Sequence, residues 1–251
     1  MLLETSGLTK RFGGVVAVNS IDLAIAEGQV FGLIGPNGAG KTTLINLISG
    51  HFRADGGAIR FANADVTRLR PDQLARRGIA RTFQSIRLFK GLTVLENVLV
   101  GRYVRSRSDA LACLVPFRDA ARPERERARL LLERVGLGKR AGAFAGELAY
   151  GDQRRLEIAR ALAAEPRLLI LDEPAAGMNP TESAALREML RELAAEGITI
   201  VLIEHDVRLV MGACERVAVL NFGRKIAEGP PAEIQADPAV REAYLGVADD
   251  A

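Results

Sequence analysis

Residues 35–43 read Gly35-Pro36-Asn37-Gly38-Ala39-Gly40-Lys41-Thr42-Thr43, and they are the most informative segment of the chain. It fits the pattern G-x-x-x-x-G-K-[ST], follows the apolar run 30–34 and opens a segment of helical character, 42–49. In such a cradle, glycines let backbone N–H groups turn toward phosphates, and the helix N-terminus adds partial positive charge. The alternative, a turn that only resembles this loop, is disfavoured by the flanking strand and helix. The sequence therefore predicts a nucleoside triphosphate site.

Two side chains of the loop have specific expected roles. Lys41 is long enough to reach the β- and γ-phosphates, and the Thr42 hydroxyl is suited to hold Mg²⁺. We therefore expect all of residues 35–43 to contact the nucleotide, with ATP and Mg²⁺ as the ligands.

Composition sets the limits of the interpretation. At 251 residues, 48% hydrophobic and 26% charged, the chain fits one α/β domain or a core with a small subdomain. A formal net charge of +3 does not favour nucleic acid as a partner. Cys113 and Cys214 are too few and too isolated for a disulfide framework or a metal site, which agrees with a reducing compartment. With no apolar run near the roughly 20 residues that span a bilayer, and no leader, we expect a cytosolic location.

The N-terminal part reads as antiparallel β structure. Residues 2–25 alternate in the manner of strands with glycine turns between them, and a short strand is expected over 59–61. A helix is expected from Pro71 to Gly78 and a strand over 79–83.

The middle of the chain is helical in character. Thr93 and Glu96 fit a capping box, and a helix is expected over 123–135. The arginine-rich stretch 101–122 between them lacks paired aromatic residues, and glutamates dilute the basic charge that continues into the helix. A solvated, partner-facing surface is therefore favoured over a nucleic-acid site.

After Asp152 helices and strands alternate. The expected helices are 154–164, a helix from Pro180 that ends before Gly197, and 207–213; the expected strands are 168–171 and 198–203, followed by a hairpin at 221–223. Apolar strands that alternate with helices indicate a parallel sheet covered on both faces. Ligands of such sheets bind at the carboxyl ends of the strands.

Polar side chains follow three of these strands. Asp172 and Glu173 follow the strand 168–171, where Asp172 would join Thr42 in the Mg²⁺ shell and Glu173 would polarise the attacking water. The alternative for this pair is a simple cap, because Pro174 follows. Gln84 follows the strand 79–83, within reach of Mg²⁺ or water.

His205 follows the strand 198–203, where its imidazole would donate to the γ-phosphate or hold the water. A lone histidine is more often structural, but this one is expected at the catalytic edge of the sheet.

A second anion site is indicated at Leu148-Ala149-Tyr150-Gly151-Asp152-Gln153, where glycine stands at the head of a helix. Together with the loop 35–43, this site could serve one nucleotide only if it came from another subunit.

These motifs, together with Gln84, the stretch Leu148 to Leu162, the stretch Leu168 to Pro174, and His205, appear in a fixed order. The chain resembles the nucleotide-binding subunit of ABC transporters over nearly its whole length. The resemblance implies a P-loop NTPase of the ABC ATPase type, in which two subunits enclose two ATP molecules. Glu173 would be the general base, residues 148–153 would act on the partner's ATP, and Phe12 would stack on adenine, although it could equally be a core residue.

Arg81-Thr82-Phe83-Gln84, Thr93-Val94-Leu95-Glu96-Asn97 and the tail Tyr244-Leu245-Gly246 are typical of ATPases of branched-chain amino acid importers. This implies a second ATP-binding subunit in a homo- or heterodimer, two membrane permease subunits, a periplasmic binding protein, and a place on the cytoplasmic face of the inner membrane. Two alternatives stay open: the motor of an exporter or lipopolysaccharide-extraction system, and a non-transport ATPase of the same superfamily.

The expected organisation is a nucleotide-binding core (1–92 and 150–228), a helical subdomain (93–149) and a C-terminal helical tail (229–251). One departure from the family pattern concerns Ala149, where the signature usually carries serine. The missing hydroxyl removes a charge-assisted hydrogen bond worth roughly 1.5–3 kcal/mol. We therefore expect residues 148–153 of this chain to bind the partner's ATP more weakly than a signature with serine would, without losing that function.

Overall fold

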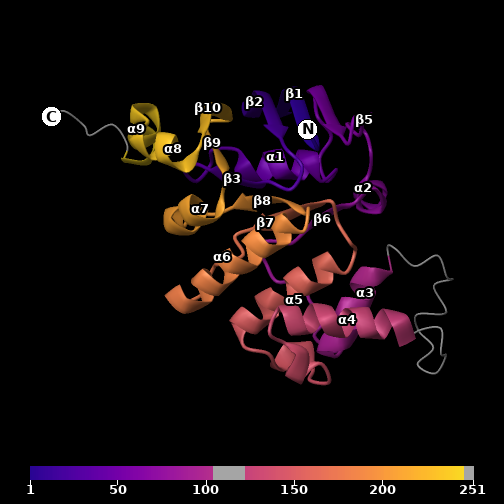
Figure 1. Ribbon diagram of the computed structural model, residues 1–251. Helices are drawn as coiled ribbons and strands as arrows, with labels where there is room; N and C mark the ends of the chain where they lie inside the picture. The colour runs from indigo at the N-terminus through magenta and orange to yellow at the C-terminus, as the bar shows by residue number, and fades with distance from the viewer. Residues whose placement is uncertain (104–121, 246–251) are drawn as a thin grey trace.

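The computed structural model describes residues 1–103 and 122–245 (Figure 1). Cys113, most of the stretch 101–122 and the end of the tail 229–251 lie outside the described residues. The strands are β1 (Leu3–Phe12), β2 (Val15–Ile25), β3 (Val30–Ile34), β4 (Gly56–Phe61), β5 (Ala64–Asp65), β6 (Ile79–Arg81), β7 (Leu168–Asp172), β8 (Thr199–Ile203), β9 (Arg216–Asn221) and β10 (Arg224–Gly229). The helices are α1 (Lys41–Ile48), α2 (Pro71–Arg77), α3 (Val94–Arg102), α4 (Arg122–Arg134), α5 (Tyr150–Leu162), α6 (Pro180–Ala195), α7 (Val207–Ala213), α8 (Pro231–Ala236) and α9 (Pro238–Leu245), with short 3-10 turns at Gly138–Arg140 and Ala145–Glu147.

The N-terminal strands form the predicted antiparallel β structure, and β4 and β5 join it in a sheet with the order β2-β1-β4-β5. Leu3 of β1 lies opposite Ile25 of β2 on one side and Phe61 of β4 on the other. The antiparallel β portion is thus one continuous sheet around the central strand β1.

The second sheet has the order β10-β9-β3-β8-β7-β6. Neighbouring strands from β9 to β6 are parallel, and β10 joins the edge through the antiparallel hairpin expected at 221–223. Because β3, β8, β7 and β6 are consecutive neighbours, their carboxyl ends share one edge of the sheet. The phosphate loop and the polar residues that follow these strands are therefore carried on the same edge.

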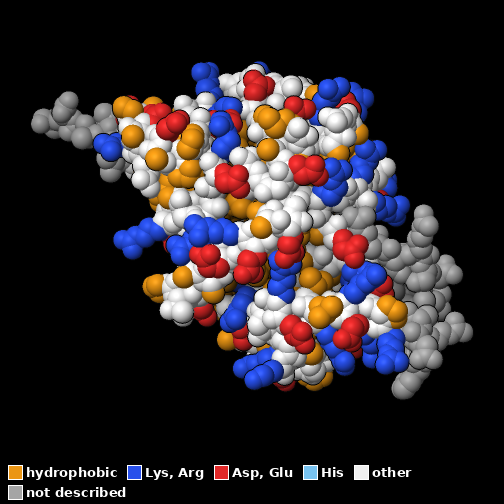
Figure 2. Space-filling model, in the orientation of Figure 1, with side chains coloured by type: hydrophobic (Ala, Val, Ile, Leu, Met, Phe, Trp, Pro, Cys, Tyr) orange, Lys and Arg blue, Asp and Glu red, His pale blue; other side chains and the backbone are white. Residues whose placement is uncertain are grey.

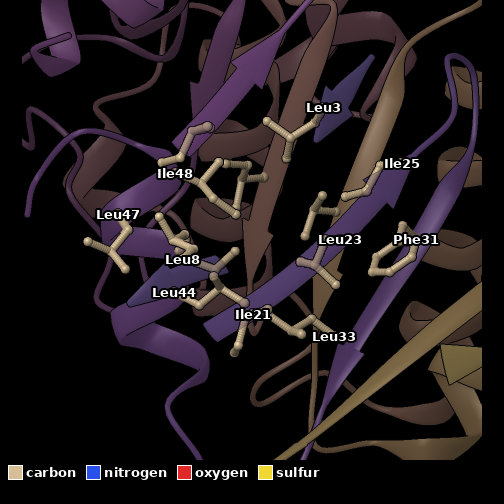
Figure 3. Close-up of a cluster of buried hydrophobic side chains, with 14 of the residues drawn as sticks. Leu3, Leu8, Ile21, Leu23, Ile25, Phe31, Leu33, Leu44, Leu47 and Ile48 are labelled. Carbon is tan, nitrogen blue, oxygen red and sulfur yellow. The ribbon is translucent and has the colours of Figure 1, made fainter. Parts of the chain in front are cut away.

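Alternate residues of the parallel strands belong to two different cores. Leu168 and Ile170 of β7 pack in the cluster that includes α1 and the antiparallel sheet, whereas Leu169 and Leu171 pack with α6 and α7 on the opposite face. Figure 3 shows the first cluster, in which Leu44 of α1 lies among side chains of both sheets. Burial on both faces explains why these strands are apolar at most positions.

Helices α3, α4 and α5 form a third cluster beside the sheets, seen at the bottom of Figure 1. The predicted capping box begins α3: Thr93 Oγ1 accepts from the backbone N–H of Glu96, and the Glu96 carboxylate accepts from that of Thr93. In the part of the chain that the structure describes, no helix is long and apolar enough to cross a membrane. Figure 2 shows basic and acidic side chains interspersed over one face, in keeping with the small net charge.

Two predicted boundaries, at the residues after β6 and before α5, were wrong. The helix expected over 154–164 is α5, which begins at Tyr150 because the backbone N–H of Gln153 already bonds to the carbonyl of Ala149. The strand expected over 79–83 ends at Arg81. Beyond it, the carbonyls of Phe83 and Gln84 accept hydrogen bonds from the Arg154 side chain instead of from a neighbouring strand. The error in the strand has a long-range cause, which is the contact between Arg154 of α5 and the segment after β6. The helix begins earlier through a local bond of its own first turn.

Candidate functional site

The loop between β3 and α1 requires glycine at both ends. Gly35 has φ 149° and Gly40 has φ 101°. A Cβ atom at Gly35 would lie 2.2 Å from the Leu220 carbonyl oxygen, and one at Gly40 would lie 2.3 Å from that of Ala17. Any larger residue would force the loop away from the strands that support it. The loop therefore has this shape because the chain packs tightly behind it.

A cavity of about 400 Å³ opens in front of the loop. Its lining includes Asn37, Gly38, Ala39, Gly40, Lys41, Thr42 and Thr43 from the loop, together with Ala17, Gln84, Glu173, Ile203 and His205. The structure thus brings most of the predicted nucleotide-contacting residues together with four of the five predicted catalytic and metal-binding residues, Thr42, Gln84, Glu173 and His205; Asp172 is not among the lining residues.

The Lys41 ammonium lies against the loop. Its Nζ atom donates to the carbonyl oxygens of Gly35 at 2.6 Å and Pro36 at 3.0 Å. Burial lowers the pKa of Lys41, and the carboxylates of Glu173 and Asp172 oppose this effect. The ammonium group is therefore bonded to the loop and also feels the charge of the two carboxylates at the end of β7.

Glu173 connects the ends of three neighbouring strands. Nε2 of His205 lies 2.7 Å from Oε1 of Glu173, and Nε2 of Gln84 donates to Oε2 at 3.0 Å. The backbone of Glu173 has φ 50°, an uncommon value for a residue with a side chain, and its N–H donates to the Ile203 carbonyl at 2.9 Å. The carboxylate is thus fixed from both sides at the edge of the cavity.

Asp172 is buried beside Glu173 and pairs with Arg81. The Arg81 guanidinium donates to Oδ2 of Asp172 at 2.9 Å. Thr42, Gln84 and Asp172 are a hydroxyl, an amide and a carboxylate, which are the hard oxygen ligands that Mg²⁺ prefers. Among the described residues there is no cluster of three or more His, Cys, Asp or Glu arranged to hold a metal ion.

Two charged residues at this edge were missed by the sequence analysis as site residues. The first, Arg81, is a lone cation in an otherwise apolar strand. The second, Glu204, is a carboxylate directly after β8; it is 4% exposed and accepts from the backbone N–H of Ala175 at 2.7 Å. Burial raises the pKa of Glu204. A charged residue inside or directly after a buried strand was the available signal in both cases.

The signature stretch 148–153 lies at the start of α5, and its residues are not among those lining the cavity. Ala149 occupies the N-cap position and makes no side-chain capping bond. A serine there would accept a hydrogen bond from the first turn of the helix. The departure from the family pattern therefore leaves a helix terminus without its usual cap.

Tyr150 connects the signature stretch to two neighbouring loops. A Cβ atom at Gly177 would lie 3.1 Å from the Tyr150 ring, so the loop after β7 passes closely over this side chain. The Tyr150 hydroxyl lies 3.0 Å from the Arg154 guanidinium, which also donates to the carbonyls of Phe83 and Gln84. Helix α5 is thus tied to the segment that carries Gln84.

Phe12 lies at the end of β1 and is 44% exposed. Its ring makes an edge contact with Phe52 at a centroid distance of 5.3 Å, and the Lys10 ammonium lies 5.4 Å from its centre. The structure therefore places Phe12 at the surface rather than in the core. Phe12 is not among the described residues that line the cavity.

A glycine-rich loop between a parallel strand and a helix, with carboxylates at the ends of neighbouring strands, defines a P-loop nucleotide-binding cassette. Residues 18–176 match the ABC transporter family, and the chain belongs to that family. Residues 224–250 match the family described as branched-chain amino acid ATP-binding cassette transporter. The predicted fold class and family are thereby confirmed.

The chain is 46% identical over 251 residues to the high-affinity branched-chain amino acid transport ATP-binding protein BraF of Pseudomonas aeruginosa. It is 45% identical to LivG of Escherichia coli, which carries the same description. Both alignments cover 98% of each chain. The lipopolysaccharide export system ATP-binding protein LptB of Acidithiobacillus ferridurans is 36% identical, over 98% of this chain and 97% of that one.

Solved structures of ATP-binding cassettes have the same fold. The ADP conformation of one such cassette superposes with a TM-score of 0.86 at 36% identity, over 98% of both chains. A dimeric bacterial ABC transporter cassette superposes with a TM-score of 0.80 at 27% identity, over 92% of this chain and 99% of that one.

Proposed function

We propose that this chain is the ATP-binding and ATP-hydrolysing subunit of an ABC importer for branched-chain amino acids. The observation that carries the proposal is the Glu173 carboxylate, held by His205 and Gln84 at the edge of the cavity formed by the phosphate loop. The full-length similarity to BraF and LivG supports the choice of transported substrate.

In the proposed mechanism, the residues 35–43 bind the phosphates of ATP and Lys41 neutralises their charge. Glu173 accepts a proton from the attacking water, while His205 fixes the carboxylate and faces the γ-phosphate. Thr42, Gln84 and Asp172 would hold Mg²⁺, which would neutralise charge on the phosphates. Phe12, exposed at the end of β1, would stack on the adenine.

A second ATP-binding subunit would complete the site. The residues of that second subunit equivalent to 148–153 would contact the γ-phosphate of the ATP bound by this chain. ATP would then hold the two subunits together, and hydrolysis would release them. The dimeric cassette of the same fold supports this arrangement. The complex would include two permease subunits and a periplasmic binding protein, with this chain on the cytoplasmic face of the inner membrane.

The competing function is an exporter or lipopolysaccharide-extraction motor. The match of residues 224–250 and the higher identity to the importer ATPases favour import. The test is reconstitution of the copurified complex in vesicles with the binding protein and, in separate assays, radiolabelled leucine, isoleucine or valine. The proposal expects ATP-dependent uptake of at least one of them. ATP hydrolysis without uptake of any branched-chain amino acid would overturn the import assignment.

A further inference from the structure

Arg81 stands at the end of β6, where it joins three elements of the site. Its guanidinium donates to Oδ2 of Asp172 at 2.9 Å, to Oδ1 of Asn46 at 2.6 Å and to Oγ of Ser49 at 3.1 Å. Asn46 belongs to α1 and Ser49 is its C-cap, so the same side chain binds the end of β7 and the helix that follows the phosphate loop.

Arg81 and Asp172 form a buried pair. Their side chains are 7% and 6% exposed, and Nε of Arg81 has no hydrogen-bond partner among the described residues. Desolvation offsets most of the attraction in such a pair, so it contributes little to stability. A buried pair of this kind does fix the orientation of its carboxylate, which is the property that matters next to the phosphate loop.

Because Arg81 binds Oδ2 of Asp172, the other carboxylate oxygen, Oδ1, is left for another partner. Arg81 binds Oδ2 of Asp172, and the charge of Asp172 also acts on Lys41. The Phe83 ring lies 5.0 Å from the guanidinium carbon and covers the outer side of the cation. The Arg81 side chain is thereby held in one place, and so is the carboxylate it binds.

We propose that Arg81 is a positioning residue for the magnesium ion of ATP: it fixes Asp172 so that Oδ1 faces the phosphate loop. The proposal rests on the proposed function, because it assumes that Mg²⁺ enters with ATP and is held by Asp172. Arg81 acts through Asp172 and does not itself touch the metal ion. Loss of residues that orient a metal ligand commonly lowers metal affinity by about 10–100-fold.

The test is the affinity of the full chain for ATP, measured by calorimetry with Mg²⁺ and again with EDTA. The decisive quantity is the ratio of the two dissociation constants. In Arg81→Gln we expect the gain in affinity from Mg²⁺ to fall by about tenfold or more, with the affinity in EDTA little changed. Arg81→Lys, which keeps one cationic donor, should recover part of the gain. Arg102→Gln is the matched control, because Arg102 is also a buried arginine paired with carboxylates, in the helical part of the chain.

Equal losses with and without Mg²⁺ in Arg81→Gln would reveal a purely structural role and overturn the proposal, as would an unchanged ratio. A melting curve for each variant identifies loss of folding. Wild-type protein that binds no ATP under either condition would overturn the proposed function itself, an outcome distinct from a variant that keeps the wild-type ratio.

Discussion

His205 holds Glu173 through a contact of 2.7 Å between Nε2 and Oε1, although the two residues follow different strands. The strands β7 and β8 are direct neighbours, with Asp172 opposite Ile203, so the chain delivers both side chains to one point on the sheet edge. Gln84 holds the other oxygen of the carboxylate. A carboxylate fixed from both sides is well placed to accept a proton from a water in the cavity.

Replacement of Glu173 by glutamine should leave ATP binding intact and stop turnover. The amide keeps the shape of the side chain but cannot accept the proton, and loss of a general base costs roughly 10²–10⁴-fold in rate. The measurement is phosphate release by the assembled complex, alongside ATP binding by the isolated subunit. The exposed Glu188→Gln variant on α6 is the control. Retained turnover in Glu173→Gln would rule out the general-base role.

Lys41→Ala should weaken nucleotide binding itself. The ammonium group lies at the phosphate loop, and loss of a charge-assisted hydrogen bond of about 1.5–3 kcal/mol corresponds to an affinity roughly 10–100-fold lower. Titration with a fluorescent ATP analogue measures the change, with the exposed Lys139→Ala as control. An unchanged affinity in Lys41→Ala would contradict the phosphate-cradle interpretation.

Ala149→Ser should act in two separable ways. As the N-cap of α5, serine should stabilise the subunit by about 1 kcal/mol, which raises the melting temperature by about 2–4 °C. In the assembled complex its hydroxyl should also raise ATPase activity through a bond to the partner's nucleotide. Ala149→Gly is the matched control, because glycine caps a helix nearly as well but has no hydroxyl. Equal activity in the two variants would refute the hydrogen bond to ATP.

Glu204 should make stability depend on pH. Burial raises its pKa in the folded chain above the ordinary value of 4.5, so the folded state holds its proton more tightly than the unfolded state. The free energy of unfolding should therefore fall as pH rises from that value through the raised pKa. Glu204→Gln keeps an acceptor for the Ala175 N–H and should give a flatter profile. Urea unfolding at several pH values measures this dependence of the free energy of unfolding on pH, with the exposed Glu192→Gln as control. The same pH dependence in Glu204→Gln and in wild type would contradict the prediction.

Much of the fold could be predicted from local sequence. The phosphate loop, the capping box at Thr93 and the helix that begins after Asn179 all depend on residues within a few positions, and the structure confirms each of them. The uniformly apolar strands also predicted a sheet covered on both faces. Local patterns of this kind decide which elements form.

Long-range partners could not be predicted in the same way. Arg81 is 91 residues from Asp172 in the sequence, and Arg154 is 71 residues from Phe83. Which of these groups come into contact depends on the order of the strands in the sheet. Neither the spacing of the motifs nor the composition of the chain specifies that order. The contact between Arg154 and the segment after β6 also explains why that strand ends before its predicted position. The roles of Phe12 and of residues 148–153 stay predictions, because they concern a nucleotide and a second subunit.

The central claim is that ATP joins two cassettes and that hydrolysis at Glu173 separates them. The most direct measurement is the mass in solution of Glu173→Gln, by light scattering with ATP and with ADP, alone and with the copurified second ATP-binding subunit. We predict a two-chain particle with ATP and single chains with ADP. Single chains in ATP, with the second subunit present and the nucleotide bound, would contradict the account.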